Sequence, residues 1–197
     1  MTREDKSLLL ERYARGRETA LINDYILIGP TQVCEKLGLE ESEWKVIFDY
    51  LVFQHGLLYK CVLKSNDFFL EAYIKHGAAH IRDILEVKSV KYELVWESVF
   101  DYLAVAQEGL TYHVLQNRDR YVNEFQAKGG TFIRKSLGIW NEKYDKQWEQ
   151  IVELLLHAAC EEFFSDQDFE HSLRSFSHIV NAGRTHRPVW QMELIKK

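Results

Sequence analysis

Two pairs of side chains in this sequence have the spacing of metal ligands on a helix. His76 and His80 are four residues apart, and so are Glu153 and His157. Residues at this spacing share one helix face, where imidazole and carboxylate groups can bind an ion together. Solvated pairs at the same spacing are far more common, and the paired Glu-x-x-His motifs of di-iron bundles do not occur. We therefore expect no metal site and no cofactor.

The residues that serve as nucleophiles in enzymes form no catalytic pattern. Cys34, Cys61 and Cys160 make no CxxC pair, and the sequence has no GxSxG, P-loop, GxGxxG or HExxH motif. Cys34 and Cys160 fall on apolar faces of expected helices, which indicates packing in the core. Scattered cysteines are also typical of a reducing compartment. A non-enzymatic protein is the interpretation that these residues favour.

A helix-turn-helix pattern is centred on Gly38. A turn between two crossed helices requires a left-handed residue, and glycine adopts that conformation without strain. Pro30 and Thr31 are suited to begin the first helix. The apolar positions that would hold the two helices together are Val33, Leu37, Leu39, Trp44 and Ile47. The pattern predicts helices over about 30–38 and 40–54.

Composition and charge are those of an ordinary globular protein. The 197 residues are 46% hydrophobic and 28% charged, with a net charge of -5 at pH 7. The only prolines are Pro30 and Pro188, so a mainly α-helical fold is expected. No apolar run approaches the ~20 residues that span a bilayer. The polar N-terminal sequence is unlike a signal peptide, so we expect a cytoplasmic protein that does not associate with membranes.

The order of these patterns predicts three parts. A helix-turn-helix head would occupy residues 1–73 and would begin with a helix over 5–27. A helical ligand-binding and dimerisation bundle would follow over 74–184, and the tail would be 185–197. No internal repeat period is evident.

One segment of the head allows two structures. Residues 57–63 and 68–73 are β-prone runs on either side of a polar turn, which indicates a short hairpin, the wing of a winged helix. Ser65, Asn66 and Asp67 would also suit the start of a helix. We favour the hairpin, with helix from about 67–73 onward.

Two segments resemble the TetR family of transcriptional regulators. LKSNDFFLEAYIKHG (63–77) is similar to the start of the family's fourth helix, and WEQIVELLLHAACEEFFSDQDFEHSLRSFSHIVNAG (148–183) is similar to its last two helices. The run 50–58 is more similar to the corresponding part of winged-helix regulators. Both resemblances imply a DNA-binding transcriptional regulator. The TetR resemblance also implies a homodimer that responds to a ligand.

In such a regulator, basic and polar residues of the head would contact DNA: Arg15, Arg17, Thr31, Gln32, Ser42, Lys45, Lys60 and Lys64. DNA affinity comes largely from basic side chains that neutralise phosphates. Residues 30–54, however, hold two lysines against five carboxylates, a balance of 2 minus 5, or -3. The alternative is therefore a helical protein-interaction adaptor whose winged-helix-like head does not bind DNA.

The remaining predictions concern the expected bundle. Aromatic and polar residues would line a pocket for a small apolar ligand: Trp96, Phe100, Tyr112, His113 and Gln116. Simple packing in the core is the other interpretation of this set. Apolar stripes on the last two helices would form a homodimer interface: Trp148, Val152, Leu155, Leu156, Phe176 and Ile179. In a monomer, earlier helices of the same chain would cover these stripes instead.

Overall fold

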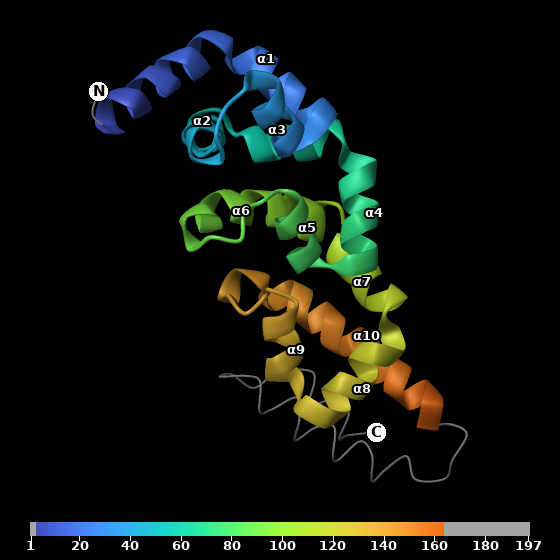
Figure 1. Cartoon of the computed structure of the whole chain (residues 1–197). Coiled ribbons are helices and arrows are strands. Elements are labelled where there is room, and N and C mark those ends of the chain that lie inside the picture. Colours follow the sequence, from blue (N-terminus) through green and yellow to red (C-terminus); the bar gives the residue numbers. More distant parts are fainter. Residues whose placement is uncertain (1–2, 164–197) are drawn as a thin grey trace. The chain divides into compact units, whose positions relative to one another are not determined.

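The computed structural model describes residues 3–163, and they are predominantly helical (Figure 1). The elements are α1 (Arg3–Leu37), α2 (Glu41–His55), α3 (Leu57–Lys64), α4 (Asn66–His76), α5 (Ala78–Ile84), η1 (Val90–Tyr92), α6 (Glu93–Phe100), η2 (Asp101–Ala106), α7 (Gly109–Gln116), α8 (Arg118–Lys128), α9 (Gly130–Ser136), η3 (Glu142–Tyr144) and α10 (Asp145–Phe163). Of the short elements, η1 and η3 are 3-10 helices and η2 is a π-helix. The expected mainly α fold is confirmed, and no strand occurs within the described range.

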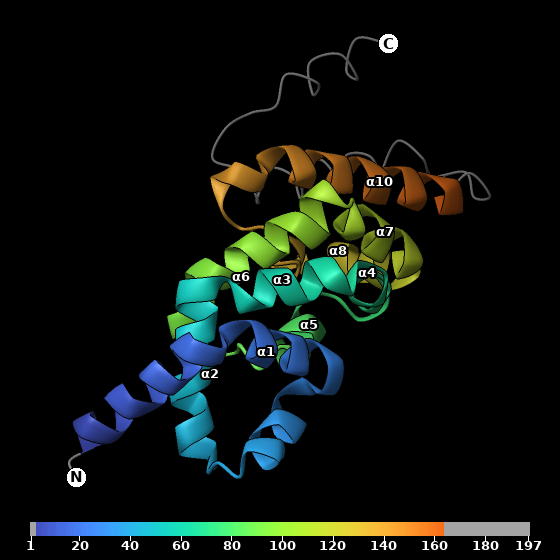
Figure 2. The ribbon, with the colours of Figure 1, turned by 90° about the horizontal axis from the view of Figure 1, so that it is seen from above.

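The first helix is interrupted twice. Arg17 (φ -135°, ψ 15°) and Gly29 (φ 75°, ψ 172°) leave the helical region, so α1 consists of three helical stretches. Pro30 follows the second interruption, where its fixed φ and missing N–H suit a helix start. Figure 2 shows the change of direction within α1. Gly38 then adopts a left-handed φ of 61° before α2, as the turn pattern predicts.

The predicted hairpin wing is wrong, because residues 57–76 form the helices α3 and α4. Four apolar side chains of α3 are buried: Leu57, Leu58, Cys61 and Val62. Their spacing places them on one helix face, and burial of that face outweighs the β propensity of the individual residues. Ser65 (φ -120°, ψ 39°) separates the two helices, and α4 begins at Asn66, close to the helix start that the sequence offered as the alternative.

The chain contains an internal sequence repeat, although none was expected from the sequence. Trp44, Trp96 and Trp148 are each 52 positions apart. The eight residues that begin at these tryptophans read WKVIFDYL, WESVFDYL and WEQIVELL. All three indole rings are buried, in α2, α6 and α10 respectively. Recurring units of this length are typical of helical repeat proteins.

Each repeat contains four helical segments in the same order, and we define the repeats as residues 3–56, 57–108 and 109–160. The first repeat uses the three stretches of α1 followed by α2. The second uses α3, α4, α5 and α6, which continues into η2, and the third uses α7, α8, α9 and α10. The second and third repeats align without a gap. The first lacks four residues between Leu39 and α2, where the other two form η1 and η3.

Backbone irregularities recur at equivalent positions of all three repeats. A residue with φ between -112° and -135° separates the first and second helical segments: Arg17, Ser65 and Asn117. A residue with φ between 75° and 81° separates the second and third: Gly29, Gly77 and Gly129. A left-handed residue follows the third: Gly38, Glu86 and Gly138. The three repeats therefore share the same sequence of backbone irregularities, although their amino-acid sequences differ.

Glu86 allows the equivalence of the three turns to be tested, because it has a left-handed φ of 56° at a position where the other two repeats have glycine. A residue with a Cβ is strained in this region, and glycine is not. We expect Glu86→Gly to raise the free energy of unfolding by roughly 0.5–1 kcal/mol, measured by denaturant unfolding. Glu97→Gly, in the interior of helix α6, should instead destabilise the protein by about 1 kcal/mol. A destabilising Glu86→Gly would show that the three turns are not equivalent.

A side chain of the third helical segment closes the following turn in every repeat. Arg82 Nη2 donates to the carbonyl oxygen of Val87 (3.3 Å), and Arg134 Nε donates to that of Ile139 (2.9 Å). In the first repeat, Cys34 Sγ lies 3.1 Å from the carbonyl oxygen of Leu39 at the same position. Both arginines also reach an acidic residue at the start of the fourth segment: Arg82 reaches Glu93 and Arg134 reaches Asp145. In each case the acceptor is the carbonyl group of the residue directly after the left-handed turn residue, so the contact holds the turn against the preceding helix.

Loss of this contact should destabilise its repeat. We expect Arg134→Ala to lower the free energy of unfolding by about 1.5–3 kcal/mol. The variant loses a charged donor, and the backbone carbonyl groups that accepted its hydrogen bonds are left without that partner. Arg120→Ala is the control, since Arg120 is mostly exposed, pairs with Glu124 on its own helix and lies over the ring of the adjacent Tyr121. That pair contributes a few tenths of a kcal/mol. Equal unfolding midpoints for the two variants would contradict a structural role for Arg134.

The described residues form two compact units: residues 3–72 with 79–107, and residues 73–78 with 108–163. The first unit thus extends further along the chain than the head expected over 1–73, and residues 79–107 belong with it. Residues 164–184 of the expected bundle and the expected tail 185–197 lie outside the described part of the chain.

Within the first unit, Asp49 joins the first repeat to the second. Lys91 Nζ and the Tyr92 hydroxyl, both in η1, donate to the Asp49 carboxylate at 2.7 and 2.6 Å. The Tyr92 ring also packs against the rings of Phe48 and Phe53, with centroids 5.8 and 5.7 Å apart. Successive repeats in this unit are therefore held by a buried aromatic contact and a charged hydrogen bond.

Candidate interaction site

All eight residues predicted to bind DNA lie in the first unit and are exposed. Three of them already contact neighbouring side chains. Lys45 lies over the rings of Phe48 and Tyr92, at 5.4 and 5.0 Å from the ring centroids. Lys64 donates to Asn23, and Arg17 lies over the ring of Tyr13. The exposure required for DNA contact is present, but part of the positive charge faces the protein itself.

Internal ion pairs neutralise further lysines of this unit. Lys6 pairs with Glu43, Lys36 with Asp24, and Lys91 with Asp49. The hydrogen bond from Lys6, with a second from the backbone N–H of Glu40, lowers the pKa of the Glu43 carboxyl. Glu43 therefore remains charged at neutral pH at the start of α2, where its charge also favours the helix dipole.

The residues predicted to line a ligand pocket are divided between the two units. Trp96 and Phe100 are buried in the first unit with ring centroids 6.0 Å apart, at the repeat positions of Trp44 and Phe48. The other three belong to the second unit: Tyr112 and Gln116, which are exposed, and His113, which is buried. Repeat packing thus explains the two aromatic residues, in agreement with the core alternative.

His113 is held as a neutral ring inside the second unit. Its Nδ1 donates to the carbonyl oxygen of Ile74 (2.7 Å), so its Nε2 accepts from the hydroxyl of Tyr121 (2.8 Å). Burial lowers the pKa of His113, and the bond to Ile74 opposes this only in part. Burial of the ring therefore favours the uncharged form of His113.

The burial of His113 makes stability depend on pH. Because the folded-state pKa of His113 lies below its ordinary value near 6.5, the unfolded chain binds the proton more readily. The stabilisation is complete above that value and is lost as the pH falls through it. We expect the free energy of unfolding to decrease between about pH 7 and pH 5.5, and to decrease less in His113→Gln. An identical pH dependence in the two proteins would exclude His113 as its source.

Three residues predicted for the dimer interface are buried within the second unit. Trp148, Val152 and Leu155 are at most 3% exposed, and α10 packs there against α7 and α8. Leu156 is half-buried. This arrangement corresponds to the monomer alternative, in which the chain covers its own apolar stripe. Phe176 and Ile179 lie outside the described residues, and a homodimer remains a prediction.

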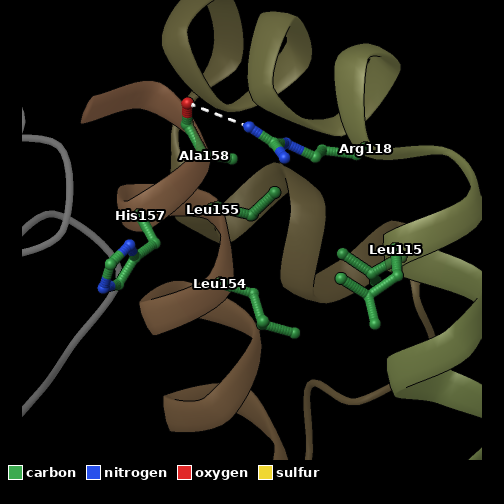
Figure 3. A pocket seen from close by; sticks show the side chains of 7 residues that line it. Leu115, Arg118, Leu154, Leu155, His157 and Ala158 are labelled. Carbon is green, nitrogen blue, oxygen red and sulfur yellow. Dashed lines mark hydrogen bonds between the residues drawn. The ribbon is translucent and has the colours of Figure 1, made fainter. Parts of the chain in front are cut away.

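A cavity of about 220 Å³ opens beside α10 in the third repeat. Its lining comes from α7, α8 and α10: Val114, Leu115, Arg118, Leu154, Leu155, His157 and Ala158. Figure 3 shows Leu115 opposite Leu154 and Leu155, with Arg118 extended toward the carbonyl oxygen of Ala158, 3.4 Å away. Ligand pockets usually measure about 300–1,000 Å³, so this cavity suits one large side chain better than a whole ligand.

Most residues of this cavity were not among the predicted site residues; only Leu155 was, and for a dimer interface. The signal that would have found them is the 52-residue period, since it shows where the third repeat differs from the second. A second cavity, of about 250 Å³, lies in the first unit: its lining is Lys6, Leu9, Leu10, Tyr13, Leu37 and Leu39.

Within residues 3–163, no group of three or more His, Cys, Asp or Glu side chains is placed to hold a metal ion. No single described helix is long and apolar enough to cross a membrane, although α2 and α3, bent by 78° from each other, together reach that length and composition.

Comparison with known proteins gives no relative. No protein family, no curated protein and no solved structure matches this chain.

Proposed function

We propose that this chain is a non-enzymatic helical-repeat scaffold that binds other proteins. The observation that supports this most is the threefold recurrence of the same four-segment unit, with its tryptophan, its left-handed turn and its turn-closing side chain. Repeat proteins keep the buried positions of each unit and vary the exposed ones, which they use for recognition. The residue after each tryptophan follows this rule: it is Lys45 in the first repeat and a glutamate in the second and third, exposed at Lys45 and Glu149 and half-buried at Glu97.

The helix-turn-helix pattern supports this proposal once it is compared across the repeats. The turn at Gly38 has counterparts at Glu86 and Gly138, and each leads to a fourth segment with a buried tryptophan. The residues that suggested a DNA-binding head are therefore those that every repeat uses for its own packing. A pattern that recurs for packing reasons is weak support for DNA recognition in one copy.

The charge of the first repeat also favours a protein partner. Glu40, Glu41 and Glu43 surround the start of α2, where a recognition helix would approach the bases. Carboxylates at this position repel phosphates. The lysines nearest to them, Lys6 and Lys45, contact Glu43 and aromatic rings within the unit.

A DNA-binding regulator remains the second candidate, because the eight predicted contact residues are all exposed on one unit. In that case Lys45→Ala and Arg15→Ala should each reduce the salt dependence of DNA binding by about one unit of slope. The ligand response and the homodimer of that candidate have no support beyond the sequence.

Selection of a random peptide library on the immobilised full-length protein tests the scaffold. We expect enrichment of related peptides, which compete with one another in fluorescence-anisotropy titrations and are not displaced by duplex DNA. A library that yields no binding peptide would contradict the proposal. So would peptides that are displaced only by DNA, because that result would assign their site to the regulator.

A further inference from the structure

The cavity of the third repeat has seven lining residues, and each has a counterpart 52 positions earlier in the second repeat. Four lining residues are identical to their counterparts 52 positions earlier: Val114 with Val62, Leu115 with Leu63, Leu155 with Leu103, and Ala158 with Ala106. Three differ: Leu154 replaces Tyr102, Arg118 replaces Asn66, and His157 replaces Val105. The apolar wall is thus retained, while the residues around the opening change.

In the second repeat, Tyr102 stands at the sequence position of Leu154, and its side chain reaches Asn66, the counterpart of Arg118. Its hydroxyl donates to Asn66 Oδ1 (3.0 Å), and its ring meets the edge of Tyr59 at a centroid distance of 5.7 Å. The first repeat also has a tyrosine here, Tyr50. Only the third repeat has the shorter Leu154, which lacks both the ring and the hydroxyl group.

The second repeat therefore serves as a template for what the third repeat can bind. We propose that the cavity receives a tyrosine side chain from a bound partner peptide, in place of the ring that Leu154 lacks. This inference rests on the proposed scaffold function and names its site. The apolar wall would bury the ring, whose transfer from water is the main driving force.

Arg118 suits the hydroxyl end of such a ring. Asparagine accepts the Tyr102 hydroxyl proton in the second repeat, whereas an arginine can only donate. A tyrosine hydroxyl can also accept a hydrogen bond, so it can pair with either residue. Arg118 Nη2 lies 3.4 Å from the carbonyl oxygen of Ala158, and an arginine guanidinium carries five N–H donors in all.

The site can be tested without a known partner, using p-cresol, which has the structure of a tyrosine side chain. We expect p-cresol to produce saturable shifts in the methyl NMR signals of Leu115 and Leu154 in the full-length protein. Leu154→Tyr should fill the cavity, abolish the saturable shifts and raise the melting temperature. Leu94→Tyr is the matched control: it adds a tyrosine at a leucine that is 81% exposed, and should leave p-cresol binding unchanged.

A second variant tests the same cavity in case Leu154→Tyr does not fold. Leu115→Trp narrows the cavity from the opposite wall at a residue that is already 45% exposed, and it should weaken p-cresol binding at least tenfold. No saturable binding to the parent protein, or equal binding to the filled variants, overturns the inference.

The selected peptides provide the second arm of the test. Peptides from the library should contain a tyrosine whose replacement by alanine weakens binding at least tenfold, and they should lose affinity for Leu154→Tyr to a similar extent. Peptides that bind Leu154→Tyr as tightly as the parent would overturn this site and still support the scaffold. A library without binders would overturn both.

Discussion

Replacement of Trp148 by alanine is expected to lower the free energy of unfolding by about 3–5 kcal/mol, the usual cost of removing a buried tryptophan. Trp148 is 3% exposed, and its repeat counterparts Trp44 and Trp96 are equally buried at 5%. Its ring lies so close to α9 that a Cβ added to Gly130 would be 3.0 Å from Trp148 Cζ2. Neighbours packed this closely cannot collapse fully into the space that alanine would leave. Denaturant unfolding of the full-length protein measures the effect.

Trp140→Ala is the control for this experiment. Trp140 precedes the same repeat element but is 71% exposed, so its loss should change the free energy of unfolding by less than about 0.5 kcal/mol. A Trp148→Ala protein within 1 kcal/mol of the parent would show that the repeated tryptophan does not organise the core.

Gly77→Ala should have the second largest effect, about 3 kcal/mol of destabilisation, because two costs combine. Gly77 has a φ of 80°, at which any Cβ is strained. An added Cβ would also lie 3.0 Å from His113 Nε2, the atom that accepts the hydrogen bond of Tyr121. Displacement of the imidazole would therefore weaken the buried bonds to Tyr121 and Ile74.

Gly38→Ala separates these two costs. Its φ is also positive, 61°, but nothing lies within 4 Å of an added Cβ. We expect only the backbone strain, about 1–2 kcal/mol. Thermal unfolding of both variants gives the comparison, and an equal loss of stability would mean that contact with His113 adds nothing. A Gly38→Ala protein that melts with the parent would contradict the turn itself.

The sequence predicted those features of the fold that depend on neighbouring residues. The scarcity of proline predicted helix, and Gly38 predicted a turn, because each acts through its own backbone dihedrals. The hairpin at 57–73 was wrong for the opposite reason. Leu57, Leu58, Cys61 and Val62 have β-prone neighbours, but their burial on one face of α3 depends on helices from elsewhere in the chain.

The repeat could have been found in the sequence but was not. WKVIFDYL and WESVFDYL differ at only three positions, yet the first was assigned to a helix-turn-helix and the second to an aromatic ligand pocket. Comparison of the chain with itself would have assigned Trp96 and Phe100 to the core.

The cavity in the third repeat is harder to predict from the sequence. Leu154 and Arg118 are unremarkable side chains, and their significance comes from Tyr102 and Asn66 at the same positions of the preceding repeat. Leu115 and Leu154 belong to different helices and meet only when the third repeat folds. Residues separated in this way are brought together by tertiary packing, which local sequence patterns do not predict.

Titration of the full-length protein with fluorescent random-sequence duplex DNA, at about 50 and 200 mM salt, tests the central claim most directly. The scaffold predicts no saturable binding at the higher salt concentration and no difference between the parent and Lys45→Ala or Arg15→Ala. A DNA-binding head predicts binding that weakens steeply between the two concentrations and a smaller slope in each variant. That second result would contradict the assignment of the helix-turn-helix to repeat packing.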